Sequence, residues 1–335
     1  MDIDFVLLWV DGNDRDWRDL KNKYAKDGQD VDDSENRYRD WDILKYWFRS
    51  VEKNAPWVHK IYFVTCGQTP SWLNAEHEKI VLVNHKDFMP EEYLPTFSSH
   101  PIEWNMHRIK GLSEHFVYFN DDMFLGNVCS EEDFFKDGLP CDQAVEEPYS
   151  FNERTVFNDI LANNMVVINS HFNRKEVLKK YHGKFYNLKD GRAFVKNTAL
   201  SVLKRDDFFG FEYQHIPQPF LKSMFEKVWE ENAEWIDETC RNRFRSRDDI
   251  SPYVIKFYQF LTGEFSPVNI RKNGLAIHLD DEKEKNIGFA CDCIVNKKYK
   301  LLCLNDARVR DFEAAGKLIR EAFETVYPEK CSFEL

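Results

Sequence analysis

The chain has 335 residues, of which 46 are basic and 58 are acidic, so its formal net charge is −12. An aromatic content of 15% excludes wholesale disorder. The acidic balance argues against broad binding to nucleic acid or to anionic lipid, but it leaves room for a local basic pocket that takes one phosphorylated ligand.

The first 125 residues alternate between short apolar runs and amphipathic stretches. Buried strands are predicted at residues 3–9, 61–65, 80–83 and 116–119, and helices at 39–53 and 101–109. The polar stretch 26–36 predicts a loop. Helices between short apolar strands predict an α/β layered sheet, in which ligands bind at the carboxyl ends of the strands.

The second half of the chain has a more helical pattern. Helices are predicted at 193–203, at 219–239, from Ser251-Pro252 to Gly263, and at 309–326, with one further strand at 300–304. We therefore predict a single composite domain over 1–335. Residues 1–150 and 265–335 would form the α/β core, and residues 151–264 a mainly helical insertion.

The N-terminus and the cysteines indicate a compartment. Residues 1–14 carry acids where a signal peptide needs bases, and no stretch approaches the roughly 20 apolar residues of a membrane span. The eight cysteines are scattered, which favours free thiols over a disulfide framework. We therefore expect a cytoplasmic protein with at most a peripheral association at the inner face of the membrane.

Two of the predicted strands end in acidic loops. Asp11-Gly12 follows the first strand, and Asp121-Asp122 follows the strand at 116–119. Adjacent carboxylates at a strand end suit Mg²⁺ or Mn²⁺, and Gly12 would let the backbone approach a ligand closely. An ordinary polar turn is the alternative for both loops, because Asp is common in turns.

Three further features could carry chemistry. His215 is a natural proton acceptor near neutral pH, with a structural histidine as the alternative. Residues 241–247 (RNRFRSR) hold four arginines that could clamp a diphosphate or, alternatively, pair with nearby acids on a solvated surface. The polar stretch 95–111, with Glu103 and Arg108, could bind an anion or sugar hydroxyls, or simply cap a helix.

Four separated blocks resemble the Stealth family, which includes capsular polysaccharide phosphotransferases and the lysosomal-enzyme N-acetylglucosamine-1-phosphotransferase. The blocks are IDFVLLWVDGND (3–14), residues 37–74 with 94–126, HIPQPF (215–220) with RFRSRDDI (243–250), and LLCLND (301–306). Their order and spacing agree along essentially the whole chain. The resemblance implies a fold similar to the GT-A glycosyltransferases, with helical additions, and a nucleotide-sugar substrate for the α/β core.

The resemblance also assigns roles to individual residues. It implies a Mg²⁺ or Mn²⁺ cofactor on Asp121 and Asp122. It implies catalytic roles for His215 as general base, for Arg245 as a diphosphate clamp and for Asp122. Substrate contacts are expected from Asp11, Gly12, Glu103, Arg108 and Asn305.

The leading hypothesis is a sugar-phosphate transferase. It would move N-acetylhexosamine-1-phosphate from a UDP-sugar to a glycan hydroxyl and release UMP, in the synthesis of a capsular or surface polysaccharide. An ordinary glycosyltransferase that attacks the sugar carbon and releases UDP is a close alternative. A non-catalytic glycan-binding module is the alternative from another class, and it would not need both an acid pair and an arginine cluster. The expected partners are the nucleotide sugar and the glycan acceptor, and not nucleic acid.

Overall fold

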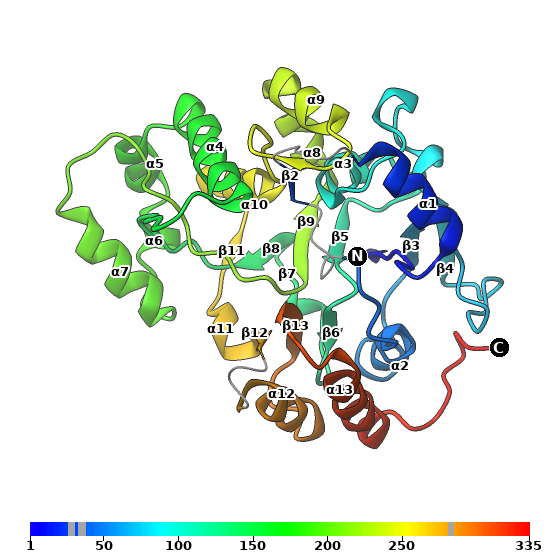
Figure 1. The fold of residues 1–335 in the computed structure, drawn as a ribbon. Coiled ribbons are helices and arrows are strands. Elements are labelled where there is room, and N and C mark those ends of the chain that lie inside the picture. Colours follow the sequence, from blue (N-terminus) through cyan, green and yellow to red (C-terminus); the bar gives the residue numbers. More distant parts are fainter. Residues whose placement is uncertain (26–30, 33–37, 281–284) are drawn as a thin grey trace.

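A central sheet of five strands organises the molecule (Figure 1). In spatial order the strands are β4 (Ile80–Asn84), β3 (Ile61–Thr65), β1 (Ile3–Leu8), β5 (His115–Phe119) and β9 (Gln218–Leu221). The first four run parallel, and β9 pairs antiparallel with β5. The fold is seen in a computed structural model that describes residues 1–25, 31–32, 38–280 and 285–335.

The apolar runs become central strands because both of their faces are covered. Every residue of β1 is buried, as expected of a parallel strand with structure packed on each side. Its one acid, Asp4, is satisfied by His59 Nδ1 at 2.7 Å and by the backbone amide of Ser113 at 2.7 Å. The four strands predicted in the first 125 residues are thereby confirmed, and so is the layered α/β class.

Three smaller sheets complete the strand pattern. The largest has the order β12 (Gly274–Asp280), β13 (Leu301–Arg308) and β6 (Met123–Leu125), so the strand predicted at 300–304 is confirmed and extends further. Shorter pairings join β10 (Arg245–Ser246) to β2 (Val31–Asp32). In the remaining sheet, β8 (Leu139–Asp142) lies between β11 (Ser266–Pro267) and β7 (Phe135–Lys136). The chain leaves β5 in the central sheet, turns at residues 120–122 and enters β6 of the other sheet. The Asp121-Asp122 turn therefore lies where two sheets meet.

Thirteen helices are described, and they cover the sheets. They are α1 (Arg15–Tyr24), α2 (Leu44–Asn54), α3 (Ser99–Asn105), α4 (Val156–His171), α5 (Arg174–Lys180), α6 (His182–Phe185), α7 (Gly191–Ser201), α8 (Lys222–Glu231), α9 (Ala233–Arg241), α10 (Tyr253–Leu261), α11 (Ile270–Asn273), α12 (Lys285–Val295) and α13 (Phe312–Val326). None of these helices is both long enough and apolar enough to cross a bilayer.

Two helix predictions need correction. The helix expected at 39–53 begins only at Leu44, because Asp42 takes a left-handed conformation (φ 54°) and Arg39 instead binds Asp306 of β13 with two hydrogen bonds. The helix expected at 219–239 is a strand followed by two helices that meet at Asn232, whose amide donates to the Val228 carbonyl and the Tyr258 hydroxyl. The predicted stop of α10 is confirmed by Gly263, which has a φ of +74°.

Residues 151–264 are mainly helical, but they also contribute strands to the sheets. They contain β9, a strand of the central sheet, as well as β10 (Figure 1). Phe116 of β5 and Phe220 of β9 lie opposite one another and are both buried. The inserted segment and the core therefore share one hydrophobic interior. The loop predicted at 26–36 lies outside the described residues, except for the two residues of β2.

Candidate active site

A cavity of about 500 Å³ opens at the carboxyl ends of β1 and β5. The ends of these two strands lie side by side, since Leu7 pairs with Phe119 in the register. Residues from β12, β13, α3 and the loop before β9 complete the walls. Six of the residues predicted to form the site line this cavity: Glu103, Asp121, Asp122, His215, Arg245 and Asn305.

Asp122 and His215 form the centre of the cavity. His215 Nε2 lies 3.4 Å from Asp122 Oδ2 and 3.4 Å from the Asn120 amide nitrogen, and its Nδ1 lies 3.4 Å from the Tyr253 hydroxyl. Asp122 is held from below by β13, because the Leu304 amide donates to its backbone carbonyl at 2.8 Å. The imidazole thus lies between the turn that joins β5 to β6 and the start of α10, with a polar neighbour at each nitrogen.

The electrostatics of this pair favour an ion pair. Burial by itself would lower the pKa of His215, but the Asp122 carboxylate outweighs burial and holds the pKa above its ordinary value. Burial would likewise raise the pKa of Asp122, yet His215 brings it below its ordinary value. His215 therefore holds a proton more tightly than a free histidine does, and it can accept a proton only from its neutral form.

Asp122 could also hold a metal ion. Its Oδ1 is buried and has no hydrogen-bond partner, as would be expected of an oxygen reserved for a cation. Cys303 Sγ lies 3.3 Å from Oδ2, and burial together with Asp122 raises the pKa of this thiol, so it stays protonated and donates to the carboxylate. The ligand atoms of Asp122, His215 and Cys303 lie within 4.8 Å of one another. With the thiol protonated, the donor set fits a hard cation on Asp122 better than a thiolate metal centre.

Asp121 lies beside Asp122 but faces the open part of the cavity. Asp121 is exposed at the surface of the cavity. The surrounding protein keeps water away from its carboxylate, and this desolvation, followed by the negative charges of Asp122 and Asp40, raises its pKa to about 8. Without a neighbouring cation, this acid would therefore be largely protonated at neutral pH. A divalent cation bound nearby would oppose that shift by favouring the charged form.

The four arginines of residues 241–247 point to different places. Arg241 pairs with Asp237 at 2.7 Å, Arg243 donates to the Pro95 carbonyl, and Arg247 pairs with Asp159 at 2.5 Å. Of the four, Arg245 alone lines the cavity, where it donates to Ser99 Oγ at 2.8 Å. Side-chain packing thus brings one of the four to the cavity, and it is the arginine to which the family resemblance assigns a role.

Three predicted site residues lie outside the cavity lining. Arg108 is exposed, and its guanidinium sits over the Trp229 ring at 4.9 Å. Asp11 uses a carboxylate oxygen to accept from the Asn13 amide at 2.8 Å, as an ordinary turn aspartate does. Gly12 is needed for close packing, since a Cβ at this position would lie 1.9 Å from the Tyr38 carbonyl oxygen. Their positions give direct support for structural roles.

Several residues in or beside the cavity were not singled out from the sequence. Asn120, Tyr253 and Cys303 contact the Asp122–His215 pair, and Tyr213 packs its ring 4.8 Å from that of Tyr253. Asn120 and Cys303 could have been suspected, because each lies within two residues of a predicted site residue in the same motif. Tyr253 comes from a different helix, and no local pattern connects it to His215.

The chain has clear relatives. Residues 1–29 match the family model of Stealth protein CR1, conserved region 1, and residues 37–141 match that of Stealth protein CR2, conserved region 2. The chain is 40% identical to the capsular polysaccharide phosphotransferase WcwK of Streptococcus pneumoniae, over 99% of this chain and 98% of that protein. It is 41% identical to the receptor polysaccharide phosphotransferase WefC of Streptococcus gordonii, over 99% of each. The chain belongs to the Stealth family.

Membership of the Stealth family confirms the resemblance inferred from the four sequence blocks, and it makes this chain an enzyme of the phosphotransferase class. A non-catalytic glycan-binding module is thereby excluded. The two matched Stealth regions contain Asp11, Gly12, Glu103, Arg108, Asp121 and Asp122. His215, Arg245 and Asn305 lie beyond them, within the span covered by the full-length relatives.

Among solved structures, this Stealth chain is similar to two glycosyltransferases. One is the galactosyltransferase LgtC in complex with donor and acceptor sugar analogues, with 12% identity, coverage of 97% of this chain and 96% of that chain, and a TM-score of 0.39. The other is the glycosyltransferase GlyE of Streptococcus pneumoniae TIGR4, with 8% identity, coverage of 100% and 65%, and a TM-score of 0.40.

Proposed function

We propose that this phosphotransferase moves a sugar phosphate from a nucleotide sugar to a hydroxyl of a glycan, in the synthesis of a capsular or surface polysaccharide. The observation that carries the proposal is the grouping of Asp122, His215 and Arg245 around one cavity at the strand ends. Transfer at phosphorus needs a base for the incoming hydroxyl and positive charge for the phosphoryl oxygens. These three residues offer both in one place.

His215 is the proposed general base. It would take the proton of the acceptor hydroxyl, and the imidazolium that forms would be stabilised by the Asp122 carboxylate 3.4 Å away. Tyr253 and Asn120 contact the ring as well, so its plane is constrained before the acceptor arrives. Preorganisation of this kind reduces the loss of entropy on reaching the reactive geometry.

Arg245 is the proposed clamp for the diphosphate. The Ser99 hydroxyl at the start of α3 accepts one of its N–H bonds and so orients the planar guanidinium. A guanidinium presents several donors in a rigid fork, which matches two phosphate oxygens better than an ammonium does. Arg245 would therefore both hold the donor and spread the charge that develops on the transferred phosphate.

Asp121 and Asp122 would hold Mg²⁺ or Mn²⁺. The fit rests on the buried, unpartnered Oδ1 of Asp122 and on the adjacent carboxylate of Asp121. Such an ion, when bound, neutralises charge on the donor diphosphate. Excess chelator should abolish turnover, and added Mg²⁺ or Mn²⁺ should restore it. Full activity in chelator would contradict this metal assignment.

The finer proposal concerns which bond breaks. The acceptor oxygen would attack the phosphorus that carries the sugar, and the nucleoside monophosphate would leave, which is UMP if the donor is UDP-N-acetylhexosamine. The sugar then keeps its anomeric configuration, because no bond to the anomeric carbon changes. An ordinary glycosyltransferase would attack that carbon and release UDP instead.

The test is to incubate the enzyme with UDP-N-acetylhexosamine, Mg²⁺ and a glycan acceptor, and to separate the nucleotides by chromatography. UMP in a one-to-one ratio with a phosphorus-containing glycan is the expected result. UDP with a phosphorus-free glycan would replace the proposal by glycosyl transfer. A panel of UDP-sugars in the same assay identifies the donor, and His215→Ala is the matched inactive control.

A further inference from the structure

One segment of the chain has a charge opposite to that of the whole. Residues 174–205 contain ten basic and two acidic side chains, a net charge of +8, whereas the chain as a whole carries −12. This segment forms α5, α6 and α7 and the connections between them, at the edge of the molecule away from the central sheet (Figure 1). The basic charge is therefore concentrated on one protruding part of the fold.

Four lysines of this segment point to solvent. Lys179, Lys180, Lys189 and Lys204 are exposed, and they form no ion pair with any carboxylate of the described residues. Other basic side chains of the segment are already engaged, as in the buried pair of Arg174 with Glu146 at 2.6 Å. Within the described part of the chain, these four lysines are thus positive charges without an ion-pair partner.

A stripe of apolar side chains lies on and beside α7, which Lys189 and Lys204 flank in the chain. Leu188, Val195 and Val202 are 76%, 65% and 74% exposed, and Ala199 is exposed as well. Val195, Ala199 and Val202 are spaced by four and three residues, which places them on one face of α7 and its C-cap, whereas Leu188 lies in the turn before α7. The opposite face of α7 is the buried one, with Ala193 and Asn197 turned inward. The apolar stripe of α7 therefore faces away from the protein.

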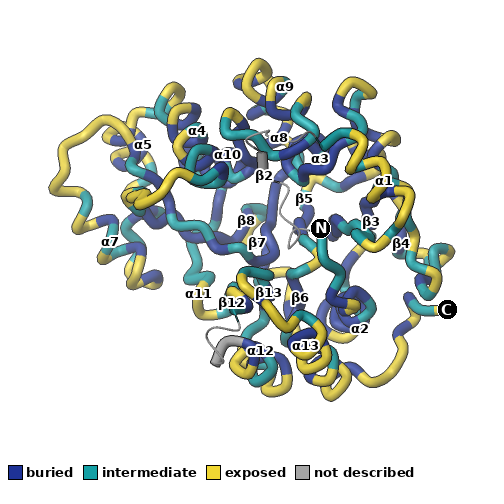
Figure 2. Tube along the Cα trace, viewed as in Figure 1, coloured by how far each residue is buried: buried dark blue, intermediate teal, exposed yellow. Residues whose placement is uncertain are grey.

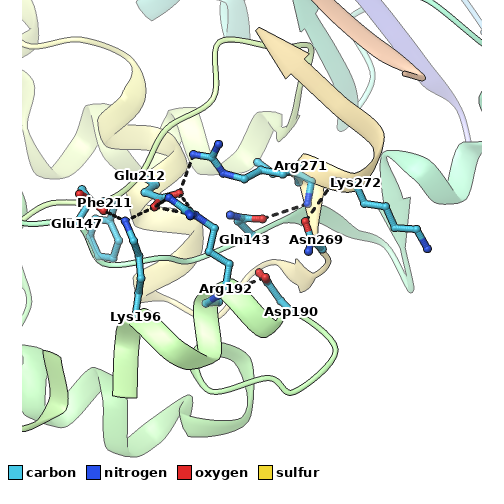
Figure 3. A network of polar contacts seen from close by, with 12 residues as sticks. Gln143, Glu147, Asp190, Arg192, Lys196, Phe211, Glu212, Asn269, Arg271 and Lys272 are labelled. Carbon is cyan, nitrogen blue, oxygen red and sulfur yellow. Dashed lines mark hydrogen bonds and ion pairs between the residues drawn. The ribbon is translucent and has the colours of Figure 1, made fainter. Parts of the chain in front are cut away.

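A polar network prevents α7 from turning this stripe inward. Arg192 and Lys196 both bind Glu212, at 2.6 and 2.5 Å, and Lys196 also binds Glu147 (Figure 3). On the buried side, the Asn197 amide donates to the Ala144 and Phe185 carbonyls. Figure 2 shows the same helix at the rim of the molecule, with exposed residues along it. Rotating α7 would break all of these contacts, so the outward stripe is a built feature.

We propose that α7 docks this enzyme onto an anionic lipid bilayer. An interfacial helix needs an apolar face that enters the headgroup boundary and basic residues that meet negatively charged lipids, and α7 with its flanking lysines has both. A second copy of this chain could match the positive charge, since the rest of the molecule is strongly acidic. The apolar stripe is one face of a single helix, however, and charge pairing alone would leave it exposed to water. A bilayer covers the apolar stripe and neutralises the lysines together.

The test uses co-sedimentation of the full chain with vesicles. We expect binding to vesicles of phosphatidylcholine that contain phosphatidylglycerol, and at least tenfold weaker binding to phosphatidylcholine alone. Raising the salt from about 0.1 M to about 1 M should release the protein, because the screening length falls from about 10 Å to about 3 Å. Lys189→Gln and Lys204→Gln should each weaken binding about five-fold, as expected for one basic residue near a charged surface.

A matched pair of variants separates the apolar stripe from general hydrophobicity. Val195→Asp with Val202→Asp should lower vesicle binding at least tenfold. Leu318 of α13 is an exposed apolar residue outside this segment, with 50% of its surface exposed, and Leu318→Asp should leave vesicle binding unchanged. Thermal unfolding, and transferase activity without vesicles, should be the same for the wild type, the double variant and Leu318→Asp. No binding to anionic vesicles at low salt, or equal binding by the double variant, overturns the proposal. A dimer in light scattering that the double variant abolishes would assign the surface to a second copy instead.

Discussion

The His215 side chain contacts the turn between β5 and β6, through Asn120 and Asp122, and it contacts Tyr253 of α10. Its replacement by alanine should lower kcat by about 10²–10⁴-fold, the usual range for the loss of a general base. The KM for the donor should change little, because donor binding is assigned to Arg245. Steady-state kinetics with both substrates measure the change in kcat separately from the change in the KM for the donor. His182→Ala, an exposed histidine of α6, is the control and should behave as wild type. Near-normal turnover of His215→Ala would place the base elsewhere.

Arg245 and Arg247 offer a comparison within one motif. Arg245 lines the cavity, whereas Arg247 is engaged by Asp159. Arg245→Lys should cost about 10²-fold in kcat/KM, because an ammonium keeps the charge but loses the forked donor geometry. Arg247→Lys keeps an ion pair at a partly exposed site and should cost less than about three-fold. Equal losses in the two variants would mean that the effect of Arg245 is structural.

At the scale of the elements, Gly12 shows how close packing holds the turn after β1 in place. A methyl group at this position would press on the Tyr38 carbonyl at 1.9 Å, so Gly12→Ala should lower the free energy of unfolding by about 1–3 kcal/mol. Gly288 of α12 has no neighbour within 4 Å of such a methyl. Gly288→Ala should therefore raise stability, by about 0.5–1 kcal/mol, through helix propensity. Thermal unfolding of the two variants should thus shift in opposite directions.

The loop before β9 is anchored by Glu212, three residues before His215. Burial alone would raise the pKa of Glu212, but hydrogen bonds from Arg192, Lys196 and Arg271 outweigh it and lower the pKa to about 2. A depressed carboxyl pKa stabilises the fold fully above the unfolded value near 4.5, and this stabilisation of about 3 kcal/mol is lost as the pH falls towards 2.

Glu212→Gln should remove that pH dependence. Denaturant unfolding measured between pH 4.5 and pH 2 should show a flatter stability curve for the variant than for the wild type. With its amide oxygen turned towards Arg271, Gln214 accepts from the same guanidinium at 2.9 Å, so part of the anchor remains in the variant. Parallel curves for the two proteins would contradict the anchoring role of Glu212.

At the scale of the whole molecule, the core and the inserted segment are tied together by β9. Removing residues 151–264 would take away this strand and expose Phe116, which packs on Phe220 at 5.9 Å and on Phe225 at 5.5 Å. A core joined by a short linker should therefore fail to fold cooperatively. Near-UV circular dichroism and thermal unfolding of the shortened chain measure whether it folds cooperatively. A sharp unfolding transition of the shortened chain would instead show two separable units.

Much of the architecture could be predicted from the sequence, because it depends on local pattern. Continuous apolar runs predicted the parallel strands, since a strand covered on both faces needs no polar alternation. The two acidic loops were expected at one edge of the sheet, and β1 and β5 are indeed neighbours there. Family membership followed from motifs that are themselves contiguous stretches of sequence.

Other features were decided only by the tertiary structure, because they depend on contacts between residues far apart in the chain. Four arginines occupy alternate positions of one stretch, and their spacing does not tell which of them faces the cavity; only the family resemblance pointed to Arg245. Cys303 meets Asp122 only because β13 runs beside β6, and Tyr253 meets His215 only because α10 packs against the loop before β9. Periodicity and composition report how each segment buries its own side chains. Which segments then share a cavity is settled by how the buried faces fit together, and that fit cannot be read from one segment at a time.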